Sequence, residues 1–313
     1  MTPRRLDLKL GYTCNNRCTF CVQGDRRARE PDLDTAEVIA RLAVARAHAS
    51  EVVLTGGEIG LRRDLATIVR AARGLGYDTV QVQSNGRVFA RPERCDELVA
   101  AGVTEFGPSL HGATAATHEA QTRSPGSWRQ TVKGIQNLVD RRQMVIVNSV
   151  VTRQNLHELP ALGQLLVHLG VEQYQLAMVH PLGTAATHFD AVVPRLDDAA
   201  PWVRAGLLPG LRAGRRVMVE AMPPCFMVGW EAALSEAYIP PTRIVDGAQV
   251  VVDYRAARVD EGKAKGPPCA RCTWDNRCEG PWREYPGRHG WDGYVPRVDT
   301  PSGTIPPVPN TRA

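Results

Sequence analysis

Three cysteines near the start of the chain have the chemistry of a metal site. Cys14, Cys18 and Cys21 share the short segment Cys-Asn-Asn-Arg-Cys-Thr-Phe-Cys. Three thiolates hold three irons of a four-iron cluster and leave the fourth iron open, since such clusters normally take four cysteines. Zinc is the alternative, but a structural zinc site has four protein ligands, and no fourth cysteine or histidine follows in this segment. The spacing therefore predicts an iron-sulfur cluster with one open, reactive iron.

A second group of thiols lies near the end of the chain. Cys269, Cys272 and Cys278 have the spacing CX2CX5C, and Cys225 lies upstream of them. Four such thiols bind zinc or an iron-sulfur cluster, and the spacing alone favours zinc. The remaining cysteine, Cys95, has no cysteine neighbour in its helix-like segment and is predicted to pack in the core.

The composition is that of a folded protein rather than of a disordered or fibrous one. The chain has 313 residues, of which 43% are hydrophobic and 23% charged, and its formal net charge is +5. No apolar run is long enough for a membrane span or a signal peptide, so a cytoplasmic protein without a membrane partner is expected. The arginines lie in short scattered groups without aromatic residues between them, which argues against a nucleic-acid partner.

Strands and helices alternate along the first two thirds of the chain. Strands are predicted at residues 6–12, 52–54, 79–83, 104–110, 144–150 and 172–179, and helices at 34–49, 65–72, 92–101, 127–142, 156–169 and 197–212. Asp34 and Glu37 match a helix-capping pattern. Six such units indicate an α/β fold with a parallel sheet, either an incomplete barrel or a doubly wound sheet.

The alternation stops near Gly214, where prolines and glycines become frequent. We therefore expect a barrel or sheet domain over 1–214, a small irregular domain over 215–299, and a flexible proline-rich tail over 300–313.

The CX3CX2C segment after the first strand, with Phe20 before its third cysteine, resembles that of the radical S-adenosylmethionine (SAM) superfamily. The resemblance implies a partial barrel of six β/α units. It implies a [4Fe-4S] cluster whose open iron binds the amino and carboxylate groups of SAM. One electron, from a donor such as flavodoxin or ferredoxin, then cleaves SAM, and the resulting 5′-deoxyadenosyl radical takes hydrogen from a substrate.

The same resemblance assigns residues to SAM. Thr55-Gly56-Gly57-Glu58 is similar to the family's glycine-glycine-glutamate motif, which contacts the amino group of SAM, although Ile59 replaces the usual proline. Strand ends carry the functional groups of barrels. Ser84, Asn85, Ser109 and Asn148 are further candidates on such strands, and the resemblance adds Arg123. It assigns Ser109, Asn148 and Arg123 to the ribose hydroxyls and the carboxylate of SAM. His111 and His180 face either the substrate or the protein core.

The second cysteine group resembles part of the auxiliary-cluster tails called SPASM and twitch. The full SPASM pattern has a further cysteine where this chain has Trp282, so one auxiliary [4Fe-4S] cluster is expected rather than two. Whether Cys225 completes this cluster is open, and zinc remains the alternative.

The expected function is that of a radical SAM enzyme. Its substrate is expected to be a peptide or a small metabolite, and the auxiliary site favours an oxidative modification or cross-link. The alternative is a non-catalytic iron-sulfur or zinc protein that keeps the barrel as a scaffold or as a nucleic-acid binder.

Overall fold

The computed structural model describes residues 4–298, so the tail expected over 300–313 lies outside the described residues. The strands are β1 (Arg5–Lys9), β2 (Glu51–Thr55), β3 (Thr79–Ser84), β4 (Glu105–Pro108), β5 (Ile146–Val151), β6 (Gln173–Met178), β7 (Arg216–Glu220), β8 (Thr242–Asp246) and β9 (Gln249–Val251). The longer helices are α2 (Thr35–Arg46), α3 (Leu65–Gly74), α4 (Pro92–Ala101), α5 (Ala115–Thr122), α6 (Ser127–Asp140), α7 (Leu159–His168) and α10 (Leu196–Arg212). One-turn helices are α1 (Arg26–Arg29), α8 (Thr184–Thr187), α9 (Phe189–Val192), α11 (Tyr254–Ala257) and α12 (Pro286–His289).

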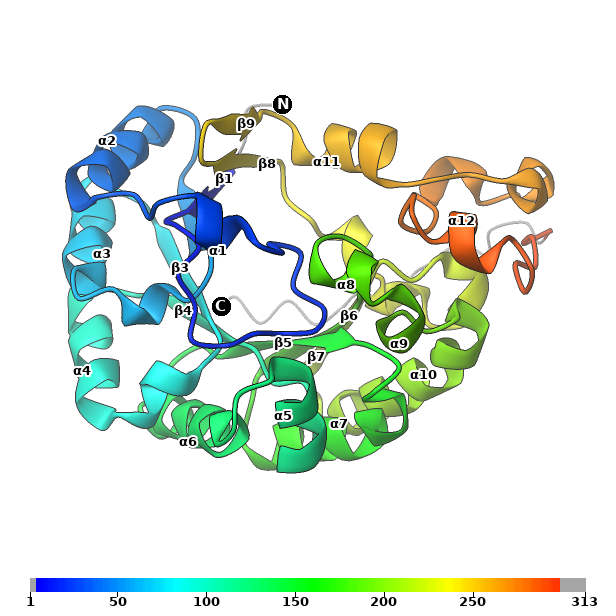
Figure 1. Ribbon diagram of the computed structural model, residues 1–313, viewed down its shortest axis with the longest axis horizontal. Coiled ribbons are helices and arrows are strands. Elements are labelled where there is room, and N and C mark those ends of the chain that lie inside the picture. Colours follow the sequence, from blue (N-terminus) through cyan, green and yellow to red (C-terminus); the bar gives the residue numbers. More distant parts are fainter. Residues whose placement is uncertain (1–3, 299–313) are drawn as a thin grey trace.

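The strands form an open barrel in which all paired strands are parallel except β8 and β9, which pair antiparallel. Their order is β4-β3-β2-β1-β8-β9 in one sheet and β5-β6-β7 in the other, and single parallel bridges such as Ser109 to Asn148 join β4 to β5. From β1 to β4 and from β5 to β7, each strand lies beside the one before it, whereas a doubly wound sheet reverses direction beside its first strand. The predicted partial barrel is therefore confirmed, with helices outside the curved sheet (Figure 1).

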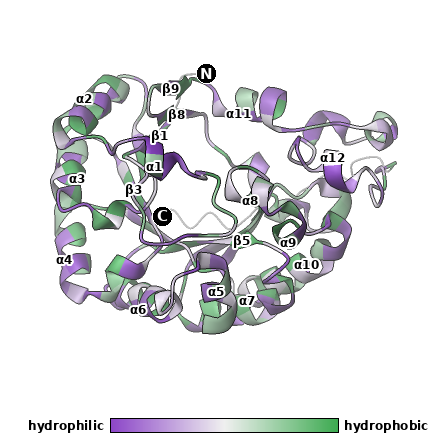
Figure 2. Cartoon of the chain, viewed as in Figure 1, coloured by the Kyte–Doolittle hydropathy of each residue, from purple (hydrophilic) through white to green (hydrophobic). Residues whose placement is uncertain are grey.

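The alternation of side chains along the strands produces the core. In β1, Leu6 and Leu8 have no exposed surface, and they pack with the apolar faces of the surrounding helices. The helices carry both hydrophobic and hydrophilic residues (Figure 2), as amphipathic covering helices do. Asp34 caps α2 by accepting a hydrogen bond from the Glu37 amide at 2.8 Å, which confirms the predicted cap.

Several elements extend beyond the pattern that the sequence displays. Strand β7 follows Gly214 and pairs with β6, so the regular sheet continues past the change in composition. Strand β8 lies in the proline-rich region and pairs in parallel with β1, more than 230 residues earlier in the chain. The irregular C-terminal region thus begins after barrel strand β7, and its strand β8 joins it to β1.

The inner face of the barrel is polar. The Gln81 amide donates to Glu105 at 2.9 Å between β3 and β4, and the Gln175 amide donates to Glu220 at 2.7 Å between β6 and β7. On β1, one carboxylate oxygen of Asp7 is buried and has no hydrogen-bond partner among the described residues. Burial raises the pKa of Asp7 to about 6, although nearby cationic side chains oppose the shift.

We expect Asp7→Asn to stabilise the protein more at pH 8 than at pH 5. Because the pKa of Asp7 is raised in the folded state, folding favours the protonated form, and this contribution is lost as the pH rises from about 4 through about 6. A neutral amide removes the cost of a buried charge, which is up to ~3 kcal/mol at pH 8. Urea unfolding at both pH values measures the difference. The control is Asp78→Asn, because Asp78 is exposed. If Asp7→Asn raised the free energy of unfolding equally at pH 5 and pH 8, the account would be contradicted.

Candidate functional site: two cysteine clusters

The first cysteine segment is the loop that follows β1 at its carboxyl end. The Arg17 amide donates to the Thr122 carbonyl at 2.9 Å, and the Thr19 amide donates to the Gln121 carbonyl at 2.8 Å. At the other end of the loop, the Thr184 amide donates to the Cys21 carbonyl at 2.9 Å. Segments that follow β4 and β6 therefore hold the loop over the barrel.

The three thiols of this loop lie within electrostatic reach of one another. Burial raises the pKa of Cys18, and the Cys21 and Cys14 thiols raise it further. Burial also raises the pKa of Cys14, with smaller contributions from Glu58 and the Cys21 thiol. The Asn16 amide donates to the Cys14 sulfur at 3.4 Å. Metal binding needs thiolates, so filling such a site replaces protons with metal. Three convergent, half-buried thiols with a hydrogen bond already present to one sulfur fit the donor set of a cluster with three cysteine ligands.

The thiolate ligands of a single zinc ion lie close together. Four thiolates around one zinc at about 2.3 Å lie within about 4 Å of one another. Among residues 4–298, no group of three or more His, Cys, Asp or Glu side chains is close enough to hold a single metal ion.

The glycine pair after β2 packs against the start of the cysteine loop. The Gly57 amide donates to the Gly11 carbonyl at 2.9 Å, and the Glu58 amide donates to the Thr13 carbonyl at 2.7 Å. A Cβ atom on Gly57 would lie 2.4 Å from the Thr13 oxygen, and Gly56 has a φ of 146°. The pair is therefore needed for close backbone packing that fixes the loop, whatever ligand it also meets.

We expect Gly57→Ala to destabilise the protein by ~1–3 kcal/mol, the usual cost of overpacking, and to lower iron binding at the first site. The added methyl group would meet backbone oxygens, which side-chain rotation cannot move away. Urea unfolding and iron analysis measure the two effects. Gly74→Ala at the end of α3 is the matched control, since nothing lies within 4 Å of its added Cβ. A Gly57→Ala protein as stable as the Gly74→Ala protein would contradict this role.

Glu58 points into the protein and organises the end of β3. Its carboxylate accepts hydrogen bonds from the Gly60 amide at 2.7 Å, the Ser84 hydroxyl at 2.8 Å and the Asn85 amide at 2.5 Å. Burial raises its pKa, and these three bonds oppose the shift. The structure thus brings Glu58, Ser84 and Asn85 into one network beneath the cysteine loop.

The other predicted SAM residues lie on or after the neighbouring elements β4, β5 and α5. Ser109 and Asn148 form a backbone bridge between β4 and β5. The Asn148 side-chain oxygen is buried without a hydrogen-bond partner in the described part of the chain. Arg123 is exposed and ends α5 with a φ of 51°, directly after Thr122, whose carbonyl binds the cysteine loop.

The two histidines have mainly structural surroundings. His111 is buried, and its ring nitrogen accepts from the Val150 amide at 3.2 Å. His180 stacks on Trp282 with ring centroids 3.7 Å apart, and burial lowers its pKa to about 4.

Cys95 is buried and donates to the Phe89 carbonyl at 3.2 Å, as predicted for a packing cysteine.

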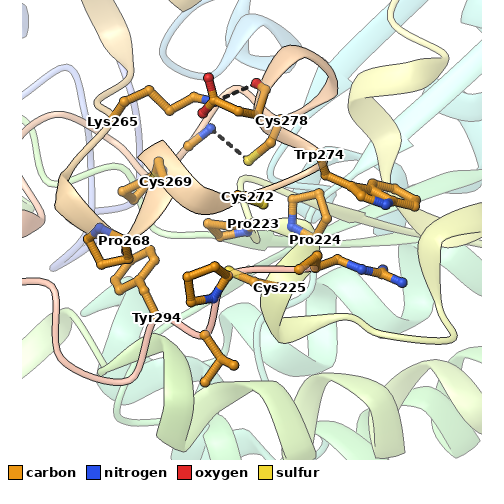
Figure 3. Close-up of a pocket in the computed structure, with 16 residues that line it drawn as sticks. Pro223, Pro224, Cys225, Lys265, Pro268, Cys269, Cys272, Trp274, Cys278 and Tyr294 are labelled. Atoms are coloured by element: carbon orange, nitrogen blue, oxygen red, sulfur yellow. Dashed lines mark hydrogen bonds and ion pairs between the residues drawn. The ribbon is translucent and has the colours of Figure 1, made fainter. Parts of the chain in front are cut away.

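The four remaining cysteines line one pocket in the C-terminal region. Figure 3 shows Cys225 approaching from one side and Cys269, Cys272 and Cys278 from the other. Burial raises the pKa of Cys225 to about 12, with a further contribution from Cys278 and the other two thiols. The structure therefore brings Cys225 to the CX2CX5C group, which the sequence spacing leaves undecided.

A buried ion network joins this region to the barrel. The guanidinium of Arg258 pairs with Glu220 at the end of β7, with Glu236 and with Glu279, at 2.5, 2.9 and 2.8 Å. Glu279 follows Cys278 directly, so the network connects the second thiol group to a barrel strand. Separating the C-terminal region from the barrel would leave uncompensated charge at this buried group. The network therefore favours a fixed position of the C-terminal region relative to the barrel.

A matching contact joins the first cysteine loop to β8. Arg26 pairs with Asp246 at 2.8 Å and lies over the Tyr12 ring at 4.1 Å. This arginine directly follows the first motif, and its partners make it a structural link rather than a free basic surface group.

Two residues near the first site had no role in the sequence analysis. Arg87 contacts the cysteine loop from the segment after β3, and Gly183 approaches it from the segment after β6. A Cβ on Gly183 would lie 2.5 Å from the Cys21 carbonyl oxygen. The only available signal was their position shortly after predicted strand ends.

The sequence matches the model of the radical SAM superfamily over residues 8–166. This match covers β1 to α7, the cysteine loop and every residue predicted to contact SAM. The chain therefore belongs to the radical SAM superfamily, whose characterised members are enzymes, and the expected [4Fe-4S] cluster that binds SAM follows from this membership.

Curated relatives include enzymes of different chemistry. The chain is 31% identical over 186 residues to a probable GTP 3′,8-cyclase of Saccharolobus solfataricus, and the match covers 59% of each chain. It is 27% identical over 183 residues to an AdoMet-dependent heme synthase of Nitratidesulfovibrio vulgaris, which covers 58% of this chain and 49% of the relative. The chain thus spans less than two thirds of the length of these relatives.

Solved structures show the same fold at low sequence identity. SuiB of Streptococcus suis bound to its precursor peptide SuiA has a TM-score of 0.68 and 12% identity, with 95% of this chain and 75% of SuiB covered. The enzyme anSMEcpe with bound AdoMet has a TM-score of 0.57 and 14% identity, with 69% of this chain and 64% of that chain covered.

Across residues 4–298, no helix combines the length and apolar character that crossing a membrane requires.

Proposed function

We propose that this enzyme reductively cleaves SAM at a cluster held by Cys14, Cys18 and Cys21, and that it abstracts hydrogen from a peptide or small metabolite. The observation that carries the proposal is the convergence of these three thiols on a loop at the carboxyl ends of the barrel strands. When bound there, a [4Fe-4S] cluster supplies an open iron for SAM and one electron for cleavage of its sulfonium. The protein binds SAM, orients it and excludes competing reactions.

Eight residues are proposed to hold SAM. The backbone at Gly56 and Gly57, with Glu58 beneath it, forms the floor for the amino group. Ser84 and Asn85 extend the same network, and the unpartnered oxygen of Asn148 accepts from a ribose hydroxyl, next to Ser109. Arg123 is proposed for the carboxylate of SAM because its planar fork suits that group and because it follows the loop contact at Thr122.

The second thiol group is proposed to hold one auxiliary [4Fe-4S] cluster with all four cysteines as ligands. Four thiols around one pocket supply one ligand for each iron, which leaves no iron open for substrate. This closed arrangement favours a role in electron transfer over a role in substrate binding. An oxidative modification or cross-link uses such a centre as an electron acceptor.

Two domains follow from this division. The SAM-binding barrel is proposed to extend from the first residue to about Glu220, which includes β7, rather than to end at residue 214. The auxiliary domain occupies 221–299, although β8 within it returns to the barrel sheet.

The substrate class rests on the relatives and on the fold. SuiB binds a precursor peptide and matches nearly the whole chain in structure, which supports a peptide. The similarity to a probable GTP 3′,8-cyclase supports a small metabolite instead. A flavodoxin or ferredoxin is the proposed electron donor.

Anaerobic incubation of the reconstituted, reduced protein with SAM tests the proposed reaction. We expect 5′-deoxyadenosine and methionine in equal amounts, measured by liquid chromatography and mass spectrometry. Absence of 5′-deoxyadenosine with every reductant and candidate substrate would contradict the proposal.

A further inference from the structure

The stretch between the first two cysteines is held by side chains from other elements. The Asn85 side-chain amide donates to the Asn15 side-chain oxygen at 2.6 Å. Arg27 donates to the Asn16 carbonyl at 3.0 Å. Asn16 is 4% exposed, and its backbone N–H donates the hydrogen bond to the Cys14 sulfur. The backbone conformation at Asn15 and Asn16 therefore decides whether the Cys14 sulfur accepts a hydrogen bond from the Asn16 backbone N–H.

Arg87 makes the largest set of contacts to this stretch. It lies in the short helix of residues 87–90 that follows β3, and one terminal nitrogen donates at 2.8 Å to the Asn15 carbonyl and at 2.8 Å to the Asn16 side-chain oxygen. The same nitrogen donates to the Ser124 hydroxyl at 2.8 Å, and the Arg87 Nε donates to Gln130 at 2.6 Å. One guanidinium thus ties the cysteine loop to the segments after β3 and β4.

Arginine suits this position for a geometric reason. Its donors have fixed directions, so Arg87 is held by Ser124 and Gln130 while it holds both asparagines. A lysine supplies the charge from one flexible ammonium group and cannot reproduce the Nε contact.

We propose that Arg87 is a positioning residue that presets the loop for the cluster and maintains the Asn16 hydrogen bond to the Cys14 sulfur. The inference rests on the proposed cluster at Cys14, Cys18 and Cys21. Hydrogen bonds to cluster sulfurs and nearby charge set the reduction potential of an iron-sulfur centre. Both a donor to sulfur and a nearby cation favour the reduced cluster, because reduction adds negative charge. Arg87 therefore makes the first cluster easier to reduce and slower to lose iron.

The test compares Arg87→Gln, Arg87→Lys and the control Arg129→Gln in a full-length chain that also carries Cys269→Ala and Cys272→Ala. The two alanines remove the second site, so iron and spectroscopic signals report the first cluster alone. Arg129 is exposed on α6, next to Gln130, and has no contact with the loop among the described residues. The readouts are the rate of iron loss to a chelator and the midpoint potential from electron paramagnetic resonance.

We expect Arg87→Gln to lose iron at least ~10-fold faster and to shift the reduction equilibrium at least ~10-fold against the reduced state, which is ~59 mV for a one-electron couple. Arg87→Lys, which keeps the charge, should fall between Arg87→Gln and the control. If Arg87→Gln does not fold, the comparison of Arg87→Lys with Arg129→Gln still tests the proposal. The unfolding temperatures of the metal-free proteins show whether an effect is confined to the loop.

Three results would each overturn a different part of the account. If both Arg87 variants match Arg129→Gln in iron loss and potential, the role of Arg87 is wrong while the cluster stands. Faster iron loss at an unchanged potential refutes the contribution through the sulfur hydrogen bond. If the parent chain with both alanines takes up no iron at all, the proposed function itself fails.

Discussion

Replacing Cys18 with alanine is expected to abolish SAM cleavage, with a loss of more than ~100-fold in 5′-deoxyadenosine formation. Outer partners of metal ligands already cost 10–100-fold when mutated, and Cys18 is proposed as a direct ligand. Burial raises the pKa of its thiol, and the Cys21 and Cys14 thiols each raise it further. A cluster left with two thiolates has two irons without a protein ligand and is not retained in a form that binds SAM.

Cys95→Ala is the matched control for this experiment. Cys95 is buried in α4 and hydrogen-bonded to the Phe89 carbonyl, so its loss affects packing and stability but not the site. We expect this variant to cleave SAM at nearly the parent rate. Cleavage retained in Cys18→Ala would show that the cysteine loop is not the site of reaction.

Replacing Cys272 with alanine is expected to halve the iron content, from about eight to about four per chain, while SAM cleavage continues. Cys272 lies in the second thiol pocket with Cys225, and the pocket is formed by residues outside the first loop. The first cluster therefore remains, but the substrate-derived electron loses its acceptor. We expect product formation to stop even though 5′-deoxyadenosine still accumulates.

Iron analysis and product analysis on the same sample distinguish the outcomes for Cys272→Ala. Unchanged iron would mean that the pocket holds no cluster. Reduced iron with unchanged product would mean that the auxiliary centre is structural. Either result would remove the argument for an oxidative reaction.

Local sequence patterns were sufficient to predict the elements of the barrel core. Strand β3 and helix α4 lie where period-two and period-3.6 alternation placed them, because each buries one apolar face. Strands β7 and β8 were missed for different reasons. Residues 216–220 follow the apparent end of the alternation, and 242–246 pair with β1 across a sequence separation that no local pattern records.

The metal ligands were easier to predict than the residues that position them. Thiol spacing indicates a metal site directly, whereas Arg87 is one of many arginines until the fold brings it to Asn15 and Asn16. The glycine-glycine-glutamate motif is a mixed case. Its position was predicted from resemblance, but the need for Gly57 comes from the approach of the Thr13 backbone, which only the tertiary structure shows.

The iron and sulfide content per chain after anaerobic reconstitution tests the central claim most directly, because both thiol groups contribute to it. Two four-iron clusters predict about eight irons and about eight sulfides per chain. The Cys18→Ala and Cys272→Ala proteins should each fall to about four. Parent protein that contains zinc and no acid-labile sulfide would contradict the account.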